Sequence, residues 1–177
     1  MGSMTLKPAN QEIIHGKRIS QRDPELVWGW GTPAGQLRAR RRGGLISRIA
    51  GLGKGMRMLE IGCGTGMFTQ MFAQSGAQIT AVDISPDLLE RARARNLPEE
   101  QVQFINKRFE DCDLHGPFDA VIGSSVLHHL DIQLALPKIY DLLKPGGAMS
   151  FAEPNMLNPQ VFIERKFTFL RPWLWYV

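Results

Sequence analysis

Short apolar segments alternate with helical patterns along most of this sequence, and this alternation constrains the fold more than any other feature. The apolar segments are residues 56–61, 77–84, 102–107, 118–125 and 148–153. Apolar residues recur at helical spacing in residues 67–74, 86–95 and 131–143. Strands that are apolar throughout and joined by helices are typical of parallel sheets covered on both faces. We therefore predict an α/β fold with a doubly wound parallel sheet of five strands.

Length and composition indicate one soluble domain. The chain has 177 residues, of which 44% are hydrophobic and 21% are charged, and these values are ordinary for a globular protein. No apolar run approaches the ~18 residues of a membrane-spanning helix, and the first residues do not resemble a signal peptide. We divide the chain into a tag remnant (1–4), an N-terminal segment with a helix over 36–50 (5–50), the α/β domain (51–155) and a partial lid or substrate segment (156–177).

Cysteine content and charge predict a cytoplasmic protein without a metal centre or a nucleic-acid partner. Cys63 and Cys112 lie far apart and lack the spacing of metal ligands, so we expect neither zinc nor a disulfide. The net charge of +4 comes in part from the run Arg38–Arg42. This run has no interleaved aromatic residues of the kind that stack on bases. We interpret it as a solvated helix face rather than a nucleic-acid patch.

Three glycines follow the first predicted strand, in the stretch MLEIGCGTG from Met58 to Gly66. Glycine lets a strand-to-helix turn close tightly and lets a ligand approach the backbone. The spacing is G-x-G-x-G, whereas the dinucleotide fingerprint is G-x-G-x-x-G. A nucleotide loop is therefore indicated, but a pyrophosphate-binding one is disfavoured. A tight turn that serves packing alone is the alternative.

An acidic residue ends the second predicted strand. Asp83 follows Gly62 by 21 residues, and in a doubly wound sheet this places its carboxylate beside the glycine loop. A carboxylate there can accept hydrogen bonds from both hydroxyls of a ribose. Asp83 or Ser85 could also cap the helix that begins near Pro86, and the two roles are compatible.

Four motifs in order carry a family resemblance. They are MLEIGCGTG, AVDISPDLLERAR, FDAVIGSSVLHHL and LLKPGGAMSF, and together they extend over residues 56–155. This set resembles the class I S-adenosylmethionine-dependent methyltransferases. The resemblance implies a Rossmann-like fold, S-adenosyl-L-methionine as cofactor and S-adenosyl-L-homocysteine as product.

The resemblance also implies roles for individual residues near the cofactor. Glu60 would fix the glycine loop or approach the amino group of the methionine part, and Asp83 would bind the ribose hydroxyls. Ile84 would pack on the adenine, and Ser124 would lie near the methionine part through its backbone. The loop that approaches the cofactor comprises Gly62, Cys63, Gly64 and Gly66.

Two positions depart from the family pattern or carry no settled role. Arg108 stands where many members have an aspartate that meets the adenine amino group. We take Phe109 and Glu110 as substitutes, for stacking and for the amino group respectively, against simple packing as the alternative. His128 and His129 follow the fourth strand, where one of them could serve as a base or could simply pack at a helix entry.

The resemblance also implies seven strands, of which only five are evident here. We expect a truncated chain whose fifth strand lies at an open sheet edge, and an edge of this kind or the apolar tail near Val177 invites a homodimer. Residues 161–170 are predicted to form a helix over the acceptor pocket. Residues proposed to line that pocket, with core packing as the alternative, are Trp28, Trp30 and Phe162.

The function implied is methyl transfer to a small-molecule acceptor, with no nucleic acid and no membrane involved. A non-catalytic module that binds S-adenosylmethionine or a protein is the alternative from another class. A nicotinamide-dependent oxidoreductase is a weaker third hypothesis, because the glycine spacing argues against it.

Overall fold

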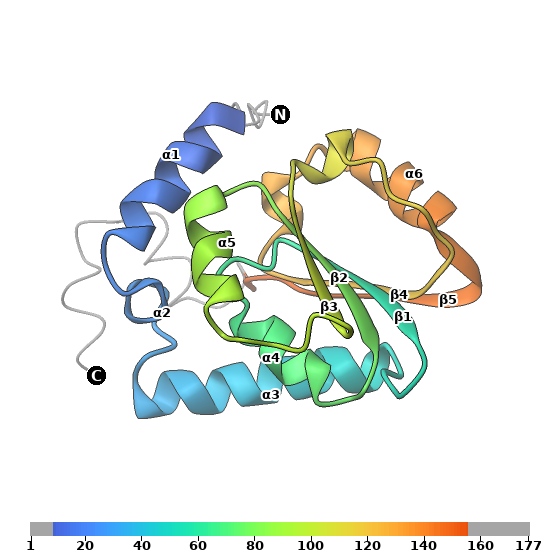
Figure 1. Cartoon of the computed structure of the whole chain (residues 1–177), viewed down its shortest axis with the longest axis horizontal. Helices are drawn as coiled ribbons and strands as arrows, with labels where there is room; N and C mark the ends of the chain where they lie inside the picture. The colour runs from blue at the N-terminus through green and yellow to red at the C-terminus, as the bar shows by residue number, and fades with distance from the viewer. Residues whose placement is uncertain (1–8, 156–177) are drawn as a thin grey trace.

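One parallel sheet organises the molecule. The computed structural model describes residues 9–155, and its strands follow the order β3-β2-β1-β4-β5 with every pair parallel (Figure 1). The strands are β1 (Arg57–Ile61), β2 (Gln78–Asp83), β3 (Val102–Asn106), β4 (Phe118–Ser124) and β5 (Leu143–Ala152). The predicted fold class and the count of five strands are confirmed within these residues.

Helices cover both faces of this sheet (Figure 1). On one face lie α3 (Pro33–Ile49), α4 (Met67–Ala73) and α5 (Pro86–Arg93), and their buried residues form one core cluster with Met58 and Ala81. On the other face, α6 (Ile132–Leu142) packs against Leu59 and Ile61 of β1. Two apolar layers therefore fix the strands, and the carboxyl ends of β1, β2, β4 and β5 meet at one edge.

The N-terminal segment contains more helix than the one stretch predicted over 36–50. It contains α1 (Ala9–Ser20) and the short α2 (Pro24–Val27). The next helix, expected over 36–50, begins earlier because Thr32 caps it: its Oγ1 accepts from the Gly35 N–H at 3.0 Å. α1 lies against α5, where the Arg91 guanidinium donates to the Ser20 carbonyl at 2.5 Å.

The largest difference from the predicted elements lies at β5. Residues 144–147 lie between the helix predicted over 131–143 and the strand predicted over 148–153, but β5 already begins at Leu143. A register shift on β4 accommodates the extra residues, since Phe118 pairs with Leu143 while Ala120 pairs with Ala148. The remaining strand and helix boundaries differ from the predicted ones by one or two residues.

β5 forms one edge of the sheet, as predicted. Within residues 9–155, no strand pairs with its outer side. The described helices include none that is long and apolar enough to cross a membrane.

Docking of α1 on α5 gives a testable consequence at Gly16. A Cβ at Gly16 would stand 2.3 Å from the Ser85 hydroxyl oxygen, whereas a Cβ at Gly44 in α3 would meet nothing within 4 Å. We expect Gly16→Ala to destabilise the fold by about 1–3 kcal/mol through overpacking. Gly44→Ala should stabilise it by about 0.5–1 kcal/mol, because alanine favours a helix more than glycine does. Urea unfolding measures both, and equal stabilisation by the two variants would contradict the docking of α1.

Candidate functional site

The glycine loop joins the end of β1 to α4 in a backbone conformation that favours glycine. Gly62, Gly64 and Gly66 have φ values of 71°, 54° and 72°, a region that other residues rarely adopt. A Cβ at Gly62 would stand 2.4 Å from Val126 Cγ2. The predicted loop glycines are therefore required by conformation, and at Gly62 also by space.

Asp83 fastens this loop to the end of β2. Its Oδ2 accepts the Gly64 N–H at 2.7 Å, and its Oδ1 accepts the Ser85 N–H at 2.8 Å. Burial raises the pKa of Asp83, and these two N–H donors oppose the shift. Each oxygen retains a second lone pair, so the carboxylate can still accept hydroxyl groups from a ligand. Ser85 caps α5, because its Oγ accepts the Leu88 N–H.

Glu60 lies beneath the loop on the face covered by α4. It is only 2% exposed, and among the described residues its Oε2 has no hydrogen-bond partner. Burial raises its pKa to about 8, the nearby Thr69 hydroxyl opposes the shift, and the charge of Asp83 adds to it. Glu60 is therefore largely protonated at neutral pH.

Two further predicted residues, Cys63 and Ile84, lie beside the loop and Asp83. Cys63 is buried, and burial together with the neighbouring Asp83 and Glu60 raises the pKa of its thiol well above the usual range. The thiol is therefore protonated and is no nucleophile. Ile84 is half-buried directly after β2, and its packing on an adenine stays a prediction.

The segment after β3 lies close to α6. Phe109 is 3% exposed within the core, and Lys138 Nζ stands 5.2 Å from its ring centroid. Glu110 Oε1 accepts the Asp131 N–H at 2.8 Å and a hydrogen bond from Arg108 at 3.2 Å. Arg108, the departure from the family pattern, thus pairs with Glu110. The predicted adenine contacts of Phe109 and Glu110 stay predictions, and the packing of Phe109 favours a structural role.

A half-buried arginine, Arg42, reaches the ends of β4 and β5 from α3. Arg42 Nη1 donates to Ser125 Oγ at 2.6 Å and to Ser124 Oγ at 3.2 Å, and its guanidinium lies 5.3 Å from the centroid of the Trp30 ring. Burial lowers the pKa of Arg42, and the charge of Glu153 opposes the shift. The predicted solvated face fits the exposed Arg41 but is wrong for Arg42, which sequence reasoning missed as a site residue.

Helical periodicity contained the signal for Arg42. Ala39 and Ile46, three residues before it and four residues after it, are both buried. Residues at these spacings share a helix face, which indicates that Arg42 lies at the buried side of α3.

A histidine pair stands beside these strand ends. His128 Nδ1 lies 2.6 Å from Glu153 Oε2, and His129 Nδ1 lies 3.2 Å from Glu12 Oε1 of α1. The two imidazole rings are 4.1 Å apart between centroids. Sequence reasoning did not single out Glu153, although its place after an apolar strand resembles that of Asp83.

Glu153 is held by backbone as well as by histidine. Its Oε1 accepts the Val126 N–H at 2.8 Å and the Leu127 N–H at 3.0 Å. Burial would raise the pKa of Glu153, but the hydrogen bonds from His128 and from the two N–H groups outweigh it and lower the pKa. Glu153 is therefore an ionised acceptor at neutral pH.

The N-terminal segment covers the glycine loop. The Trp28 ring comes within 3.4 Å of the position that a Cβ at Gly64 would take. Glu25 pairs with Arg95, and Arg95 Nε donates to the Thr65 carbonyl at 2.6 Å. Trp28 thus lies against the glycine loop, and its lining of the acceptor pocket stays a prediction, whereas Trp30 packs edge-on against Phe68. Phe162 and the predicted helix over 161–170 lie outside the described residues.

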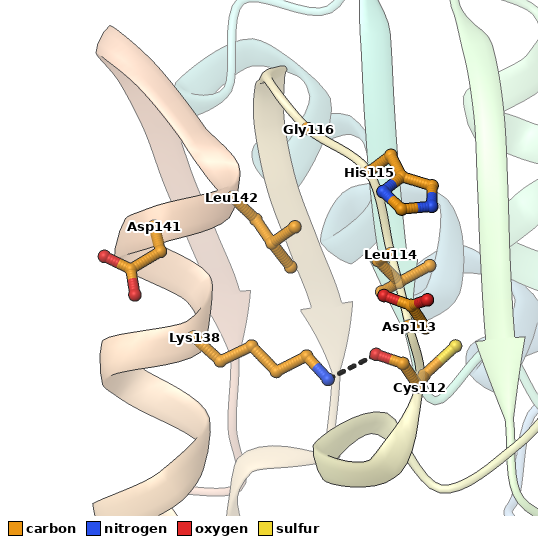
Figure 2. Close-up of a pocket in the computed structure, with 8 residues that line it drawn as sticks. All are labelled: Cys112, Asp113, Leu114, His115, Gly116, Lys138, Asp141 and Leu142. Carbon is orange, nitrogen blue, oxygen red and sulfur yellow. Dashed lines mark hydrogen bonds between the residues drawn. The ribbon is translucent and has the colours of Figure 1, made fainter.

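A separate cavity of about 530 Å³ lies between α6 and the segment that leads into β4 (Figure 2). Lys138 donates to the Cys112 carbonyl across it, and His115 lines its other side. None of the residues that line this cavity belongs to the glycine loop or the histidine pair. Within residues 9–155, no group of three or more His, Cys, Asp or Glu residues is placed to hold a metal ion.

Comparisons with known proteins agree with this geometry. The sequence model of a family described as "Methyltransferase domain" matches residues 59–149. The ubiquinone biosynthesis O-methyltransferase of Xanthomonas campestris pv. campestris (strain B100) is 37% identical over 105 residues, which are 57% of this chain and 44% of that protein. That of Xylella fastidiosa (strain 9a5c) is 34% identical over the same length. The chain spans less than half the length of these curated relatives.

Solved structures show the same fold. The cyclase SpnF matches with a TM-score of 0.70 and 25% identity, over 86% of this chain and 62% of that one. The N-methyltransferase NodS from Bradyrhizobium japonicum WM9, in complex with S-adenosyl-L-homocysteine, matches with a TM-score of 0.65 and 23% identity, over 78% and 71% of the two chains.

The raised pKa of Glu60 predicts a pH dependence of stability. The folded chain keeps a proton on Glu60 up to about pH 8, whereas the unfolded chain releases it near 4.5. Between these values the folded state binds more protons, so stability falls as pH rises. We expect Glu60→Gln to remove this loss, which is at most ~1.4 kcal/mol per pH unit. Urea unfolding at several pH values between about 5 and 8 measures it.

A matched control is Glu99→Gln, because Glu99 is exposed. Its unfolding free energy should track the wild type at every pH. A difference between Glu60→Gln and wild type that stays constant with pH would contradict a proton held on Glu60.

Proposed function

Because the chain belongs to the methyltransferase-domain family of the class I S-adenosylmethionine-dependent enzymes, we propose that it transfers a methyl group from S-adenosylmethionine to a small-molecule acceptor. The observation that carries this proposal is the glycine loop closed on Asp83, with the Gly64 N–H donating to Asp83 Oδ2 at 2.7 Å. This arrangement presents backbone and one carboxylate together at the ends of β1 and β2, where nucleosides bind in such sheets.

The residues present fit the cofactor. Its ribose hydroxyls would donate to the remaining lone pairs of Asp83, and its adenine would pack on Ile84. Its methionine end carries an ammonium and a carboxylate, and Arg42 supplies a half-buried positive charge beside the Ser124 hydroxyl for the carboxylate. Glu60, one residue before the end of β1, has a buried Oε2 without a hydrogen-bond partner among the described residues.

The cofactor, when bound, supplies an activated methyl group on a sulfonium. The protein then has to hold the acceptor atom in line at near-attack distance and to exclude water. Trp28 against Gly64 and the Glu25–Arg95 pair already cover the loop from the N-terminal side. We propose that this cover forms one side of the acceptor space.

The acceptor class, the cellular location and the oligomeric state of the protein are parts of the same proposal. The curated relatives are O-methyltransferases named for ubiquinone biosynthesis, and NodS is an N-methyltransferase, which supports a small molecule as acceptor. Both cysteines are buried and free, which supports a cytoplasmic location. The outer side of β5 supports a homodimer as the partner state.

A second candidate is a module that holds the cofactor without transferring its methyl group. The structure resembles that of the cyclase SpnF with a TM-score of 0.70. This likeness favours the second candidate, because one fold can host different reactions. Formation of S-adenosylhomocysteine from S-adenosylmethionine in the presence of acceptors separates the two candidates.

Titration calorimetry with S-adenosylhomocysteine tests the proposal directly. We expect the wild type to bind and Asp83→Ala to bind at least about tenfold more weakly, because the ribose hydroxyls lose both carboxyl oxygens as acceptors. Asp113→Ala is the control, since Asp113 is exposed and lines the separate cavity. A folded wild type that binds no S-adenosylhomocysteine would refute the function.

Arg42 gives a prediction specific to the methionine end of the cofactor. Arg42→Ala should weaken S-adenosylhomocysteine binding by about tenfold or more, through loss of a charge-assisted hydrogen bond. It should leave the affinity for 5′-methylthioadenosine unchanged, because that ligand lacks the carboxylate. Arg41→Ala, an exposed neighbour on α3, should change neither affinity. Equal weakening of both ligands by Arg42→Ala would show that Arg42 acts on the fold instead.

A further inference from the structure

We propose that the outer face of α3 docks the protein on an anionic lipid surface. This face is made of six exposed residues, Leu37, Arg40, Arg41, Leu45, Arg48 and Ile49. The inference does not depend on the proposed methyl transfer. It revises the expectation that no membrane is involved, which rested on the lack of an apolar run long enough to span a bilayer. A helix that lies on a lipid surface needs no such run.

Helical periodicity separates the two sides of α3. The buried residues Gly35, Ala39, Gly43 and Ile46 recur at intervals of three or four, so they share the side that packs against α4 and β5. The residues of the outer face lie on the other side of the helix. In Figure 1, α3 runs along one side of the molecule, and no other described element lies on its outer side.

The charge of α3 is entirely positive. No acidic residue occurs between Glu25 and Glu60, whereas the same stretch holds seven lysines and arginines. Among residues 9–155, no carboxylate forms an ion pair with Arg40, Arg41 or Arg48. Their guanidinium groups can therefore bind external anions, and a guanidinium matches a phosphate through two parallel hydrogen bonds.

Large apolar side chains lie between these arginines. Leu37 and Ile49 are 64% and 67% exposed, and Leu45 is 38% exposed. Intervals of four residues, which bring side chains next to one another on a helix, separate Leu37, Arg41, Leu45 and Ile49. Apolar and cationic groups therefore alternate along about 18 Å of helix.

A lipid surface fits this mixture better than a nucleic acid does. Phosphate headgroups would take the guanidinium groups, while the leucine and isoleucine side chains would enter the boundary of the acyl chains. The phosphates of a nucleic acid would also bind arginine, but they offer nothing to the apolar side chains. The outer face of α3 has no aromatic residue to stack on bases.

Docking through α3 also sets how the molecule stands on the surface. α3 covers one face of the sheet and α6 covers the other, so α6 would face away from the lipid. Arg42 reaches Ser124 and Ser125 from the inner side of α3. Because a helix with its side chains is about 10–12 Å across, the ends of β4 and β5 would stand about one helix diameter from the lipid.

Sedimentation of the full chain with vesicles is the first test. The wild type should bind vesicles of equal parts phosphatidylglycerol and phosphatidylcholine, and should bind pure phosphatidylcholine far more weakly. The triple variant Arg40→Gln, Arg41→Gln, Arg48→Gln should bind the anionic vesicles about 100-fold more weakly, because each arginine near an anionic surface contributes roughly fivefold. A wild type that binds neither kind of vesicle would overturn the proposal.

A second triple variant controls for net charge. Lys17→Gln, Arg18→Gln, Lys107→Gln removes the same charge from exposed positions on α1 and after β3. It should bind anionic vesicles as the wild type does, and both triple variants should match the wild type in urea unfolding, because exposed substitutions have small effects on stability. Weakening as large as that of the α3 variant would overturn the assignment to α3.

The apolar side chains distinguish a lipid from other polyanions. The double variant Leu37→Ser, Ile49→Ser should bind anionic vesicles about tenfold more weakly or worse, because less apolar surface leaves water. It should bind a DNA duplex no differently from the wild type. Vesicle binding that the double variant keeps in full would show a face for any polyanion and would overturn the assignment to lipid.

Insertion of α3 can also be observed directly, without removing any of its arginines. Both native cysteines are buried, so Leu45→Cys can be labelled selectively with an environment-sensitive fluorophore. Its emission should shift to the blue on anionic vesicles, whereas the same label at Lys107→Cys should not respond. A labelled protein that sediments with the vesicles without a shift at position 45 would place another surface on the lipid and would overturn the proposal.

Discussion

The hydrogen bond from the Gly64 N–H to Asp83 Oδ2 is the contact on which the site depends. It ties the loop after β1 to the end of β2, and it forms only if Gly64 adopts its positive φ of 54°. The parallel register of β1 and β2 brings the two strand ends level, since Ile61 pairs with Val82 one residue before Asp83. Tertiary pairing thus places one carboxylate where local sequence alone could not.

The ionisable side chains at this edge of the sheet form two groups. Asp83 and Glu60 lie beside the loop after β1, and burial raises the pKa of both carboxyl groups, that of Glu60 to about 8. Glu153 and Arg42 lie at the ends of β4 and β5. There the negative charge of Glu153 favours the charged form of Arg42 and opposes the lowering of its pKa by burial. Charged groups of low exposure have to be paired in this way, because an isolated buried charge is costly.

The sequence pattern predicted the strands and the glycine loop well. It predicted the contacts of Arg42 and Glu153 and the start of β5 less well. The strands and the glycine loop could be predicted because apolar runs and glycine spacing report burial and backbone conformation directly. Arg42 and Glu153 were missed because their roles come from contacts across 82 or more and 25 or more residues of sequence. The early start of β5 was missed because Pro145 and Gly146 are typical of turns, and pairing with β4 overrides that preference.

The N-terminal segment that covers the glycine loop links the choice of acceptor to the affinity for the cofactor. Trp28 stands against Gly64 while Glu25, three residues earlier, reaches Arg95 beside the same loop. One short stretch of chain therefore forms both a wall of the proposed acceptor space and a boundary of the cofactor loop. Substitutions in contact do not act additively, so a change in this stretch that altered acceptor choice would also alter cofactor affinity. Divergence of specificity in such a chain would proceed through paired changes on both sides of the loop.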